Sequence, residues 1–288
     1  MNRISVVIPV LNEENNIRDT LNSIYQNTRN PFEIIVADGG STDSTVEIIH
    51  NEFKAVIVLK NEKRTAAAGR NLGIKMAKGN IIAFTDGDCI VDKYWLENID
   101  SFFNKYDIDG MRGKVCNAPP RNRIDRYWGE LAWEKLMFFG DEAMDINDKD
   151  IRVVLVTANC AYTKRFLYKI KGFNNWFGNN AEDVDLCWRA IESGARLKYN
   201  PEARIFSHNI TTVRAVIKKS FRNGVSSSKL QKKYGSRFNY DPNIYKMLGR
   251  NLLELLSLKK DSVLNVIELV SHLNGKYYGS IRYRVINI

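Results

Sequence analysis

The first hundred residues alternate short apolar segments with helical segments, and this alternation restricts the fold more than any other feature of the chain. The segment ISVVIPV at 4–10 is β-branched and apolar on both faces, which is typical of a strand covered on both sides. The pattern predicts an α/β, Rossmann-like architecture, a mainly parallel sheet with flanking helices. The expected strands cover 4–10, 32–37, 55–59 and 81–85, and an expected helix at 65–77 is ended by Gly79.

Polar side chains follow three of these strands at the point where each strand ends. In open α/β sheets, ligands bind at the carboxyl ends of the strands. We therefore expect these side chains to share one ligand site, and Asn12 also to cap the helix that follows it. They are Asn12 and Glu13 after the first strand, Asp38 after the second, and Asp86 and Asp88 after the fourth.

The turn Asp86-Gly87-Asp88 releases two like charges from the end of a buried strand. Two carboxylates so close repel each other in a cleft unless a cation joins them, and hard oxygen ligands suit Mg²⁺ or Mn²⁺. His208 closes a later short strand and could add a nitrogen ligand. The chain has no Walker A motif and no GxGxxG, so the metal would carry much of a diphosphate's charge. A solvated turn is the alternative.

A second acidic group, Glu182, Asp183 and Asp185, falls in the first turn of a helix expected at 182–193. Stabilisation of the helix dipole and an ion pair to Arg189 explain Asp185. They explain Glu182 and Asp183 less well, because these two follow the aromatic, glycine-containing loop GFNNWFGNN. That loop has the composition of a lid or substrate loop.

Beyond residue 105 the regular alternation ends. The residues between the two strands expected next are polar, aromatic and helical in pattern, and only helices are expected from about residue 211 onward. The expected strands are 109–117, 151–162 and one or two within 195–207, the intervening helical region is 121–148, and the expected C-terminal helices are 211–223, 243–258 and 262–273.

The excess positive charge of the chain lies entirely in its last quarter. Residues 215–288 carry 14 Lys/Arg and 4 Asp/Glu, a net charge of +10, which is also the net charge of the whole chain. A basic segment of this kind predicts an anionic partner, and the amphipathic pattern at 213–225 favours an anionic membrane surface. A solvated helical face is the alternative.

Four scattered cysteines without metal-ligand spacing suggest reduced, buried thiols. No signal peptide is recognised at the N-terminus, and no apolar run reaches the roughly 20 residues of a membrane span. We therefore expect a cytoplasmic protein, peripheral on the cytoplasmic face of the membrane, with no nucleic-acid partner.

Six segments occur in the order found in one large enzyme family. They are SVVIPVLNEE at 5–14, VADGGSTDST at 36–45, AAGRNLGIKMAKG at 67–79, FTDGDC at 84–89, KGFNN at 171–175 and EDVDLCWR at 182–189. In this the chain resembles the GT-A-fold nucleotide-sugar glycosyltransferases of family 2, over about residues 3–210. Each motif alone is weak, but the set is highly specific. The form DGGSTD has one glycine more than the common DGSTD, which leaves the preferred base open.

The resemblance implies a role for each motif. Asp183 matches the general base, Asp88 would bind the metal directly, and Asp86 would bind ribose or the metal. His208 lies where many such enzymes have a further metal or diphosphate contact. The residues expected along the nucleotide sugar are Pro9, Asn12, Glu13, Asp38 (at the base), Arg70 (at the base or diphosphate), Asp86 and Glu182.

The implied reaction is an inverting transfer from a nucleoside-diphosphate sugar to a hydroxyl acceptor, a glycan or a lipid-linked molecule, with Mn²⁺ or Mg²⁺ on the diphosphate. The catalytic domain would span 1–210, with a nucleotide-binding half to about 105 and an acceptor half from 106, and 211–288 would form a helical basic subdomain. Because sugars stack on aromatic faces, Trp176, Trp128 and Trp133 are acceptor-side candidates. Core packing is an equal explanation for Trp128 and Trp133.

Three other functions remain open from the residues alone. A Mg²⁺-dependent phosphohydrolase also uses DxD after an apolar strand, but its turn follows the first strand. A sugar-nucleotide nucleotidyltransferase would need a basic, glycine-rich loop where this chain has PVLNEEN. A nucleic-acid-binding protein could use the basic C-terminal segment, but the acidic cluster would then have no purpose.

Overall fold

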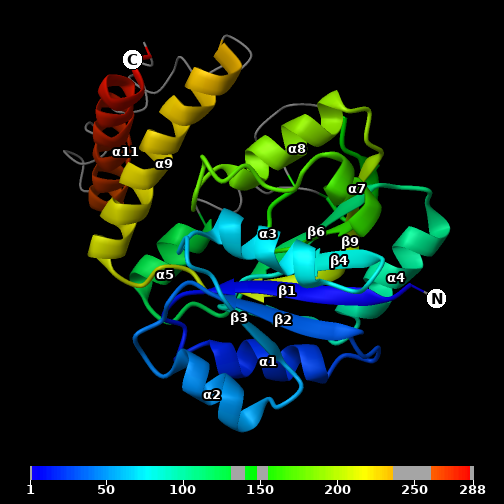
Figure 1. Ribbon diagram of the computed structural model, residues 1–288. Coiled ribbons are helices and arrows are strands. Elements are labelled where there is room, and N and C mark those ends of the chain that lie inside the picture. The colour runs from blue at the N-terminus through cyan, green and yellow to red at the C-terminus, as the bar shows by residue number, and fades with distance from the viewer. Residues whose placement is uncertain (1, 131–139, 148–154, 236–260, 286–288) are drawn as a thin grey trace. The chain divides into compact units, whose positions relative to one another are not determined.

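The computed structural model describes residues 2–130, 140–147, 155–235 and 261–285 (Figure 1). The chain divides into two compact units. The sheet unit contains residues 1–119 and 132–208, and the helical unit contains 120–131 and 209–288. The helical unit thus includes the segment 120–131, which the sequence pattern had grouped with the first 210 residues.

The sheet unit is built on one sheet with the strand order β3-β2-β1-β4-β8-β6-β9-β5, in which β7 also pairs with β9. Strands β3, β2, β1 and β4 run parallel, as the sequence predicts. Strand β8 joins antiparallel to β4, and β9 runs parallel to β6. The strands are β1 (Ile4–Val10), β2 (Glu33–Asp38), β3 (Ile57–Lys60), β4 (Ile81–Phe84), β5 (Cys89–Val91), β6 (Gly110–Asn117), β7 (Met144–Asp145), β8 (Cys160–Thr163) and β9 (Leu197–Ser207).

The helices of this unit are α1 (Ile17–Tyr25), α2 (Thr45–Glu52), α3 (Ala66–Met76), α4 (Trp95–Lys105), α7 (Lys164–Lys169) and α8 (Glu182–Glu192). Figure 1 shows α1 and α2 on one face of β1 and β2 and α3 on the other face. Strand β1 is buried on both faces because its side chains alternate between these helices. The α/β architecture with flanking helices expected from the sequence is confirmed.

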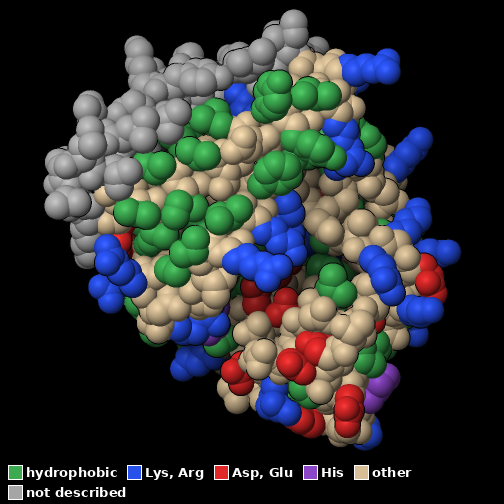
Figure 2. All heavy atoms as spheres, turned by 90° about the vertical axis from the view of Figure 1, so that its left-hand side faces the viewer, with side chains coloured by type: hydrophobic (Ala, Val, Ile, Leu, Met, Phe, Trp, Pro, Cys, Tyr) green, Lys and Arg blue, Asp and Glu red, His purple; other side chains and the backbone are tan. Residues whose placement is uncertain are grey.

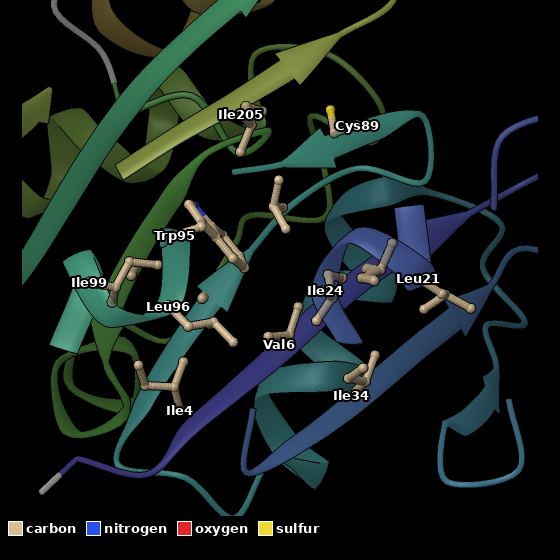
Figure 3. Close-up of a cluster of buried hydrophobic side chains, with 14 of the residues drawn as sticks. Ile4, Val6, Leu21, Ile24, Ile34, Cys89, Trp95, Leu96, Ile99 and Ile205 are labelled. Carbon is tan, nitrogen blue, oxygen red and sulfur yellow. The ribbon is translucent and has the colours of Figure 1, made fainter. Parts of the chain in front are cut away.

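The main hydrophobic core lies between the sheet and helices α1 and α4 (Figure 3). Leu21 and Ile24 of α1 lie one turn apart and are completely buried with Val6 of β1. A side chain of this size contributes about 1.5–3 kcal/mol when it is fully buried. The indole of Trp95 is also buried, and its Nε1 donates a 2.8 Å hydrogen bond to Oδ1 of Asn159. The packing of this core therefore holds β1 and β4 in place, and with them the edge of the sheet at which both strands end.

Helix α3 lies unusually close to β1 because glycines face the strand. A β-carbon on Gly73 would lie 2.3 Å from Cγ1 of Val7, and one on Gly69 would lie 3.4 Å from Cβ of Pro9. Any larger residue at Gly73 would force the helix away from the sheet. The AAGRNLG segment thus positions α3 as a rigid support behind the strand ends.

Several predicted boundaries differ from the structure. Asn12 does not cap a helix, because it has a left-handed φ of 58° and α1 begins at Ile17, after Asn16. Helix α3 ends at Met76, and Gly79 serves a different purpose: a β-carbon there would lie 2.4 Å from the carbonyl oxygen of Arg3. Within 195–207, where the sequence left one or two strands open, the structure has the single strand 197–207.

The described part of the helical unit consists of α5 (Arg123–Trp128), α9 (Val213–Tyr234) and α11 (Ser262–Tyr283). Helices α9 and α11 touch backbone to backbone, since a β-carbon on Gly224 would lie 2.0 Å from the carbonyl oxygen of His272. Both helices extend well beyond their predicted ends at 223 and 273. The helix predicted at 243–258, the first part of the strand predicted at 151–162, and Trp133 lie outside the described residues.

Candidate active site

The loops after β1 and β2 are bonded to each other at the carboxyl edge of the sheet. The backbone N–H of Asn12 donates to Oγ of Ser41 at 2.9 Å, and Oδ1 of Asn12 accepts from the N–H of Thr42 at 2.8 Å. The N–H of Glu13 donates to Oγ1 of Thr45 at 2.7 Å. The polar residues predicted after the first two strands therefore form one connected rim.

Asp38 organises the loop that carries the additional glycine. Its carboxylate accepts hydrogen bonds from the N–H of Gly40 at 3.0 Å, the N–H of Ser41 at 3.0 Å and Oγ of Ser41 at 2.6 Å. Gly40 has a φ of 85°, a conformation that glycine adopts without strain. The local role of Asp38 is therefore to shape the loop at the predicted base-binding side.

The Asp86-Gly87-Asp88 turn is packed against the loop after β1. A β-carbon on Gly87 would lie 3.0 Å from Cγ1 of Val10 and 3.1 Å from Cγ of Glu13. The carbonyl oxygen of Gly87 accepts a 2.9 Å hydrogen bond from Oγ1 of Thr20. A side chain at position 87 would thus press on Val10 and Glu13. Both aspartates are half-buried at the sheet edge.

Glu13 lies within this acidic cluster. The pKa of Glu13 is raised to about 7, chiefly by burial and also by the charges of Asp88 and Asp86, while a hydrogen bond from Asn16 opposes the rise. The cluster therefore makes Glu13 easier to protonate than an exposed glutamate. A bound cation would offset the same repulsion.

Arg70 joins the two acidic motifs of the chain. Its Nη2 donates to Oδ1 of Asp86 at 2.7 Å, and its Nη1 donates to Oε1 of Glu182 at 2.7 Å. Arg70 is 3% exposed, and its guanidinium lies 5.7 Å from the centre of the Phe173 ring. One buried cation therefore connects the end of β4 with the start of α8.

Asp183 follows Glu182 in the first turn of α8 and is only half-buried. Burial raises its pKa, and the charge of Asp86 adds to this effect. A 2.9 Å hydrogen bond from the N–H of Val184 and the charge of Arg70 act in the opposite direction. A partly accessible carboxylate with a raised pKa has the properties of a general base.

The predicted Asp185–Arg189 ion pair is confirmed, with Nε of Arg189 donating to Oδ2 of Asp185 at 2.8 Å. The other guanidinium nitrogens of Arg189 donate to the carbonyl oxygens of Ile170 at 2.7 Å and Gly172 at 2.6 Å. Asp185 is therefore structural, and it holds the loop that precedes α8.

Asp88 directly precedes β5, and His208 directly follows β9. These strands pair antiparallel with Cys89 opposite Ser207, so Asp88 and His208 flank the same end of the ladder. Nδ1 of His208 is buried and has no hydrogen-bond partner among the described residues. Within the described ranges, no group of three or more His, Cys, Asp or Glu side chains is arranged to hold a metal ion by itself.

These residues nevertheless fit a divalent cation. Mg²⁺ and related ions are commonly held by one or two carboxylates and completed by water and substrate phosphates. Asp88, with Asp86 and the free nitrogen of His208, provides such an incomplete set of ligands.

The two acceptor-side candidates within the described residues, Trp176 and Trp128, are in different settings. Trp176 is 42% exposed and packs edge-on against Phe177 in the loop before α8. Trp128 is only 5% exposed and lies in the helical unit, where the ammonium group of Lys219 is 5.3 Å from its ring centre. Trp176 is thus partly exposed in the loop before α8, while Trp128 contributes to packing.

The sequence patterns missed the partners of α3. They assigned Arg70 to the donor and did not indicate its pairing with Glu182, which is 112 residues away. They also missed Asn71, whose side chain accepts from the N–H of Phe173 and donates to its carbonyl oxygen, both at 2.8 Å. The adjacent positions of Arg and Asn in the AAGRNLG motif were the available signal.

Comparison with known proteins defines the class of this protein. Residues 5–171, more than half of the chain, match the family described as glycosyl transferase family 2. The chain therefore belongs to that family, and the resemblance of its motifs is confirmed. Membership favours the glycosyltransferase prediction over the phosphohydrolase and nucleotidyltransferase alternatives.

Two relatives show how far the similarity extends. Glycosyltransferase AglE of Haloferax volcanii is 30% identical over 227 residues, which cover 77% of this chain and 71% of AglE. Pre-mycofactocin glycosyltransferase of Mycobacterium tuberculosis is 26% identical over 234 residues, 77% of this chain but only 46% of that protein. The chain thus spans less than half the length of the second relative.

Solved structures share the fold at low sequence identity. The mannosyltransferase PcManGT from Pyrobaculum calidifontis, solved with GDP-Man and Mn²⁺, has a TM-score of 0.64 at 15% identity, covering 96% of this chain and 87% of that one. TarS residues 1–349 of Staphylococcus aureus, solved with UDP-GlcNAc, has a TM-score of 0.60 at 16% identity, covering 99% and 93%. The fold is accordingly that of the GT-A glycosyltransferases.

Proposed function

We propose that this protein is an inverting glycosyltransferase that moves a sugar from a nucleoside-diphosphate sugar to an acceptor hydroxyl. The observation that carries the proposal is the bridge through Arg70, which sets the DxD turn and the start of α8 on two sides of one buried guanidinium. Asp86, on the donor side, and Asp183, the candidate base, thereby belong to one site. A group transfer requires this, because donor and acceptor must meet.

The donor would lie along the rim formed by the loops after β1, β2 and β4. In this proposal Asn12, Glu13 and Asp38 of the rim, with Pro9 at the end of β1, lie along the nucleotide. The Asp86 carboxylate, held by Arg70 and through it by Glu182, lies near the diphosphate. The similarity to structures solved with UDP-GlcNAc and GDP-Man supports a nucleotide sugar as donor. Because the loop at Asp38 carries the additional glycine, we leave the identity of the donor's nucleotide base to experiment.

A divalent cation, Mn²⁺ or Mg²⁺, would be held by Asp88, Asp86 and His208. When bound, it supplies positive charge that neutralises the diphosphate as the sugar–phosphate bond breaks. The Mn²⁺ in the PcManGT structure supports this choice of cofactor. The side chains of this chain would orient the diphosphate at the sheet edge.

The acceptor hydroxyl would be deprotonated by Asp183. The acceptor oxygen forms a bond to the anomeric carbon while the bond from that carbon to the diphosphate breaks on the opposite face. The proton of the acceptor hydroxyl moves to the Asp183 carboxylate. A single displacement that uses one base and no enzyme nucleophile inverts the anomeric configuration. The exposed ring of Trp176, seven residues before Asp183, is suited to hold the acceptor sugar.

The proposal is tested by a thermal-shift panel of UDP-, GDP- and other nucleotide sugars, each with and without Mn²⁺. We expect one donor to raise the melting temperature in a Mn²⁺-dependent manner, because a ligand that binds the native state stabilises it. The best donor should then be hydrolysed slowly in the absence of acceptor. Asp88→Ala should lose the Mn²⁺-dependent part of the shift. The absence of any shift across the panel, or an identical shift with and without Mn²⁺, would contradict the proposal.

The acceptor is proposed to be a glycan or a lipid-linked molecule at an anionic membrane surface. Figure 2 shows apolar side chains gathered over the paired helices of the helical unit, with Lys and Arg side chains beside them. Val263, Val270 and Tyr277 are exposed at seven-residue intervals along α11, and Ile281 continues the row. The exposed apolar residues of α9 and α11, which we call the apolar face, are Val213, Ile217, Val263, Val270, Tyr277, Tyr278 and Ile281.

Charge favours a lipid surface over a second copy of the chain as the partner of the apolar face. The net charge of +10 in residues 215–288 would repel the same unit of another copy, whereas anionic lipids attract it. Exposed apolar residues beside basic ones are typical of segments that lie in a membrane interface. None of the described helices is long and apolar enough to cross a membrane.

A further inference from the structure

Arg70 has contacts that differ from those of a side chain waiting for a ligand. Both terminal nitrogens of its guanidinium are bonded to carboxylates, Asp86 on one side and Glu182 on the other, each at 2.7 Å. The side chain is 3% exposed. The positive charge of Arg70 is thus already neutralised inside the protein, and little of it faces a donor.

The backbone that carries Arg70 is held firmly in place. Helix α3 cannot shift towards β1, because Gly73 already touches Val7, and its first turn is capped by Thr65. The next residue, Asn71, makes two 2.8 Å hydrogen bonds to the backbone of Phe173. Arg70 therefore extends from a fixed support, which is what a residue that positions others requires.

Glu182, in contrast, depends on Arg70. It is the first residue of α8 and follows Ala181, which has a φ of 65° and provides no side-chain cap for the helix. Oε2 of Glu182 is buried with no hydrogen-bond partner among the described residues, so the Arg70 bond on Oε1 is its main compensation. Loss of that bond would leave a buried carboxylate uncompensated at the start of the helix that carries Asp183.

We propose that Arg70 is a positioning residue that acts through Glu182 to hold the first turn of α8, and with it the Asp183 carboxylate, in register with the Asp86 side of the site. This inference rests on the proposed function, since it assigns Asp183 the role of base. In this arrangement Arg70 contributes to turnover through the position of the base and not through contact with the donor.

The test is a double-mutant cycle with Arg70→Gln and Glu182→Gln. The quantities measured are kcat for transfer at saturating donor and acceptor, the donor Kd, and the melting temperature. Each single variant should lower kcat by up to about 100-fold, the loss expected when a reacting group moves by about 1 Å. The double variant should lose no more than the worse single variant, because both substitutions break the same bridge. The donor Kd should change little, and Arg70→Lys should restore part of kcat.

Arg18→Gln is the matched control, because Arg18 also pairs with a glutamate, Glu52, but on the exposed surface. It should leave kcat unchanged. If Arg70→Gln does not fold, the same cycle is made with Arg70→Lys, whose ammonium cannot bond both carboxylates in the same fork geometry.

Three results would overturn the inference. Losses in kcat that multiply in the double variant would show that Arg70 acts independently of Glu182. A raised donor Kd with normal kcat would make Arg70 a donor ligand. A lower melting temperature with normal kcat per folded molecule would leave only a structural role. An inactive wild-type enzyme across all donors would instead count against the proposed function.

Discussion

Asp183 combines partial exposure with surroundings that favour its protonated form. Burial and the nearby Asp86 raise its pKa, and the Val184 N–H and Arg70 only partly compensate. A base of this kind is stronger than an aspartate in water and therefore better suited to accept a proton from a sugar hydroxyl. The raised pKa of Asp183 should therefore determine how the rate of transfer depends on pH.

We expect the acid limb of the kcat profile for transfer to lie above the ordinary aspartate pKa of about 3.9. The base must be deprotonated to work, so the rate falls as the pH drops through its raised pKa. A pH–kcat series at saturating substrates measures this limb. Glu13 is the other carboxyl with a raised pKa, about 7, so the series is repeated with Glu13→Gln. The limb should persist in that variant. A flat profile down to pH 4, or a limb that disappears with Glu13, would contradict the assignment.

Much of the candidate site could be predicted from individual residues and their places in the sequence. Asp86, Asp88 and Asp183 could be singled out because each occurs where a strand or helix begins or ends. The bridge through Arg70 could not, since local periodicity gives no distance between residues that far apart in the chain. The pairing of β5 with β9, which sets Asp88 and His208 at the same end of one ladder, likewise depends on a register that strand patterns alone do not specify.

At the level of elements, the helical segments of the C-terminal quarter were predicted too short. The pattern at 211–223 belongs to α9, and the pattern at 262–273 belongs to α11. Each of these two helices has 22 residues. Serines and glycines dilute the apolar pattern of both helices, but in the structure they form the close contact between α9 and α11, as at Gly275 against Phe221. Small residues thus serve packing here, and they leave the larger apolar side chains exposed.

The apolar face on α9 and α11 should bind anionic vesicles in a flotation assay. Tyr277→Ser with Ile281→Ser should reduce the bound fraction at least about tenfold, because each large apolar side chain contributes about 1.5–3 kcal/mol when buried. Tyr168→Ser is the control, since Tyr168 is 53% exposed but lies on α7 of the sheet unit. High salt should weaken the binding of the wild-type chain.

Two results would contradict membrane binding by the apolar face. One is flotation that is equal for the wild type and the double variant, or absent for both. The other is a concentration-dependent dimer that is lost in the double variant, which would assign the apolar face to a second copy of the chain.

On the scale of the whole molecule, the α/β architecture followed from the first hundred residues because β1, β2, β3 and β4 pair with one another within that stretch. The later part of the sheet was harder to predict from the sequence, because β8, β6 and β9 pair across long stretches of chain. The grouping of residues 120–131 with the helical unit depends on contacts such as the 2.7 Å hydrogen bond from the Tyr127 hydroxyl to Oδ1 of Asn265. No pattern within 120–131 itself indicates that partner.

The central claim is that Asp183 is the base of a metal-assisted sugar transfer, and Asp183→Asn tests it most directly. The substitution keeps the shape of the side chain but removes its ability to accept a proton. Once a donor is known, transfer should fall by about 10²–10⁴-fold, the usual contribution of a general base, while the donor still binds with its wild-type affinity. Normal turnover by Asp183→Asn, or a loss of activity explained entirely by lost donor binding, would contradict the account.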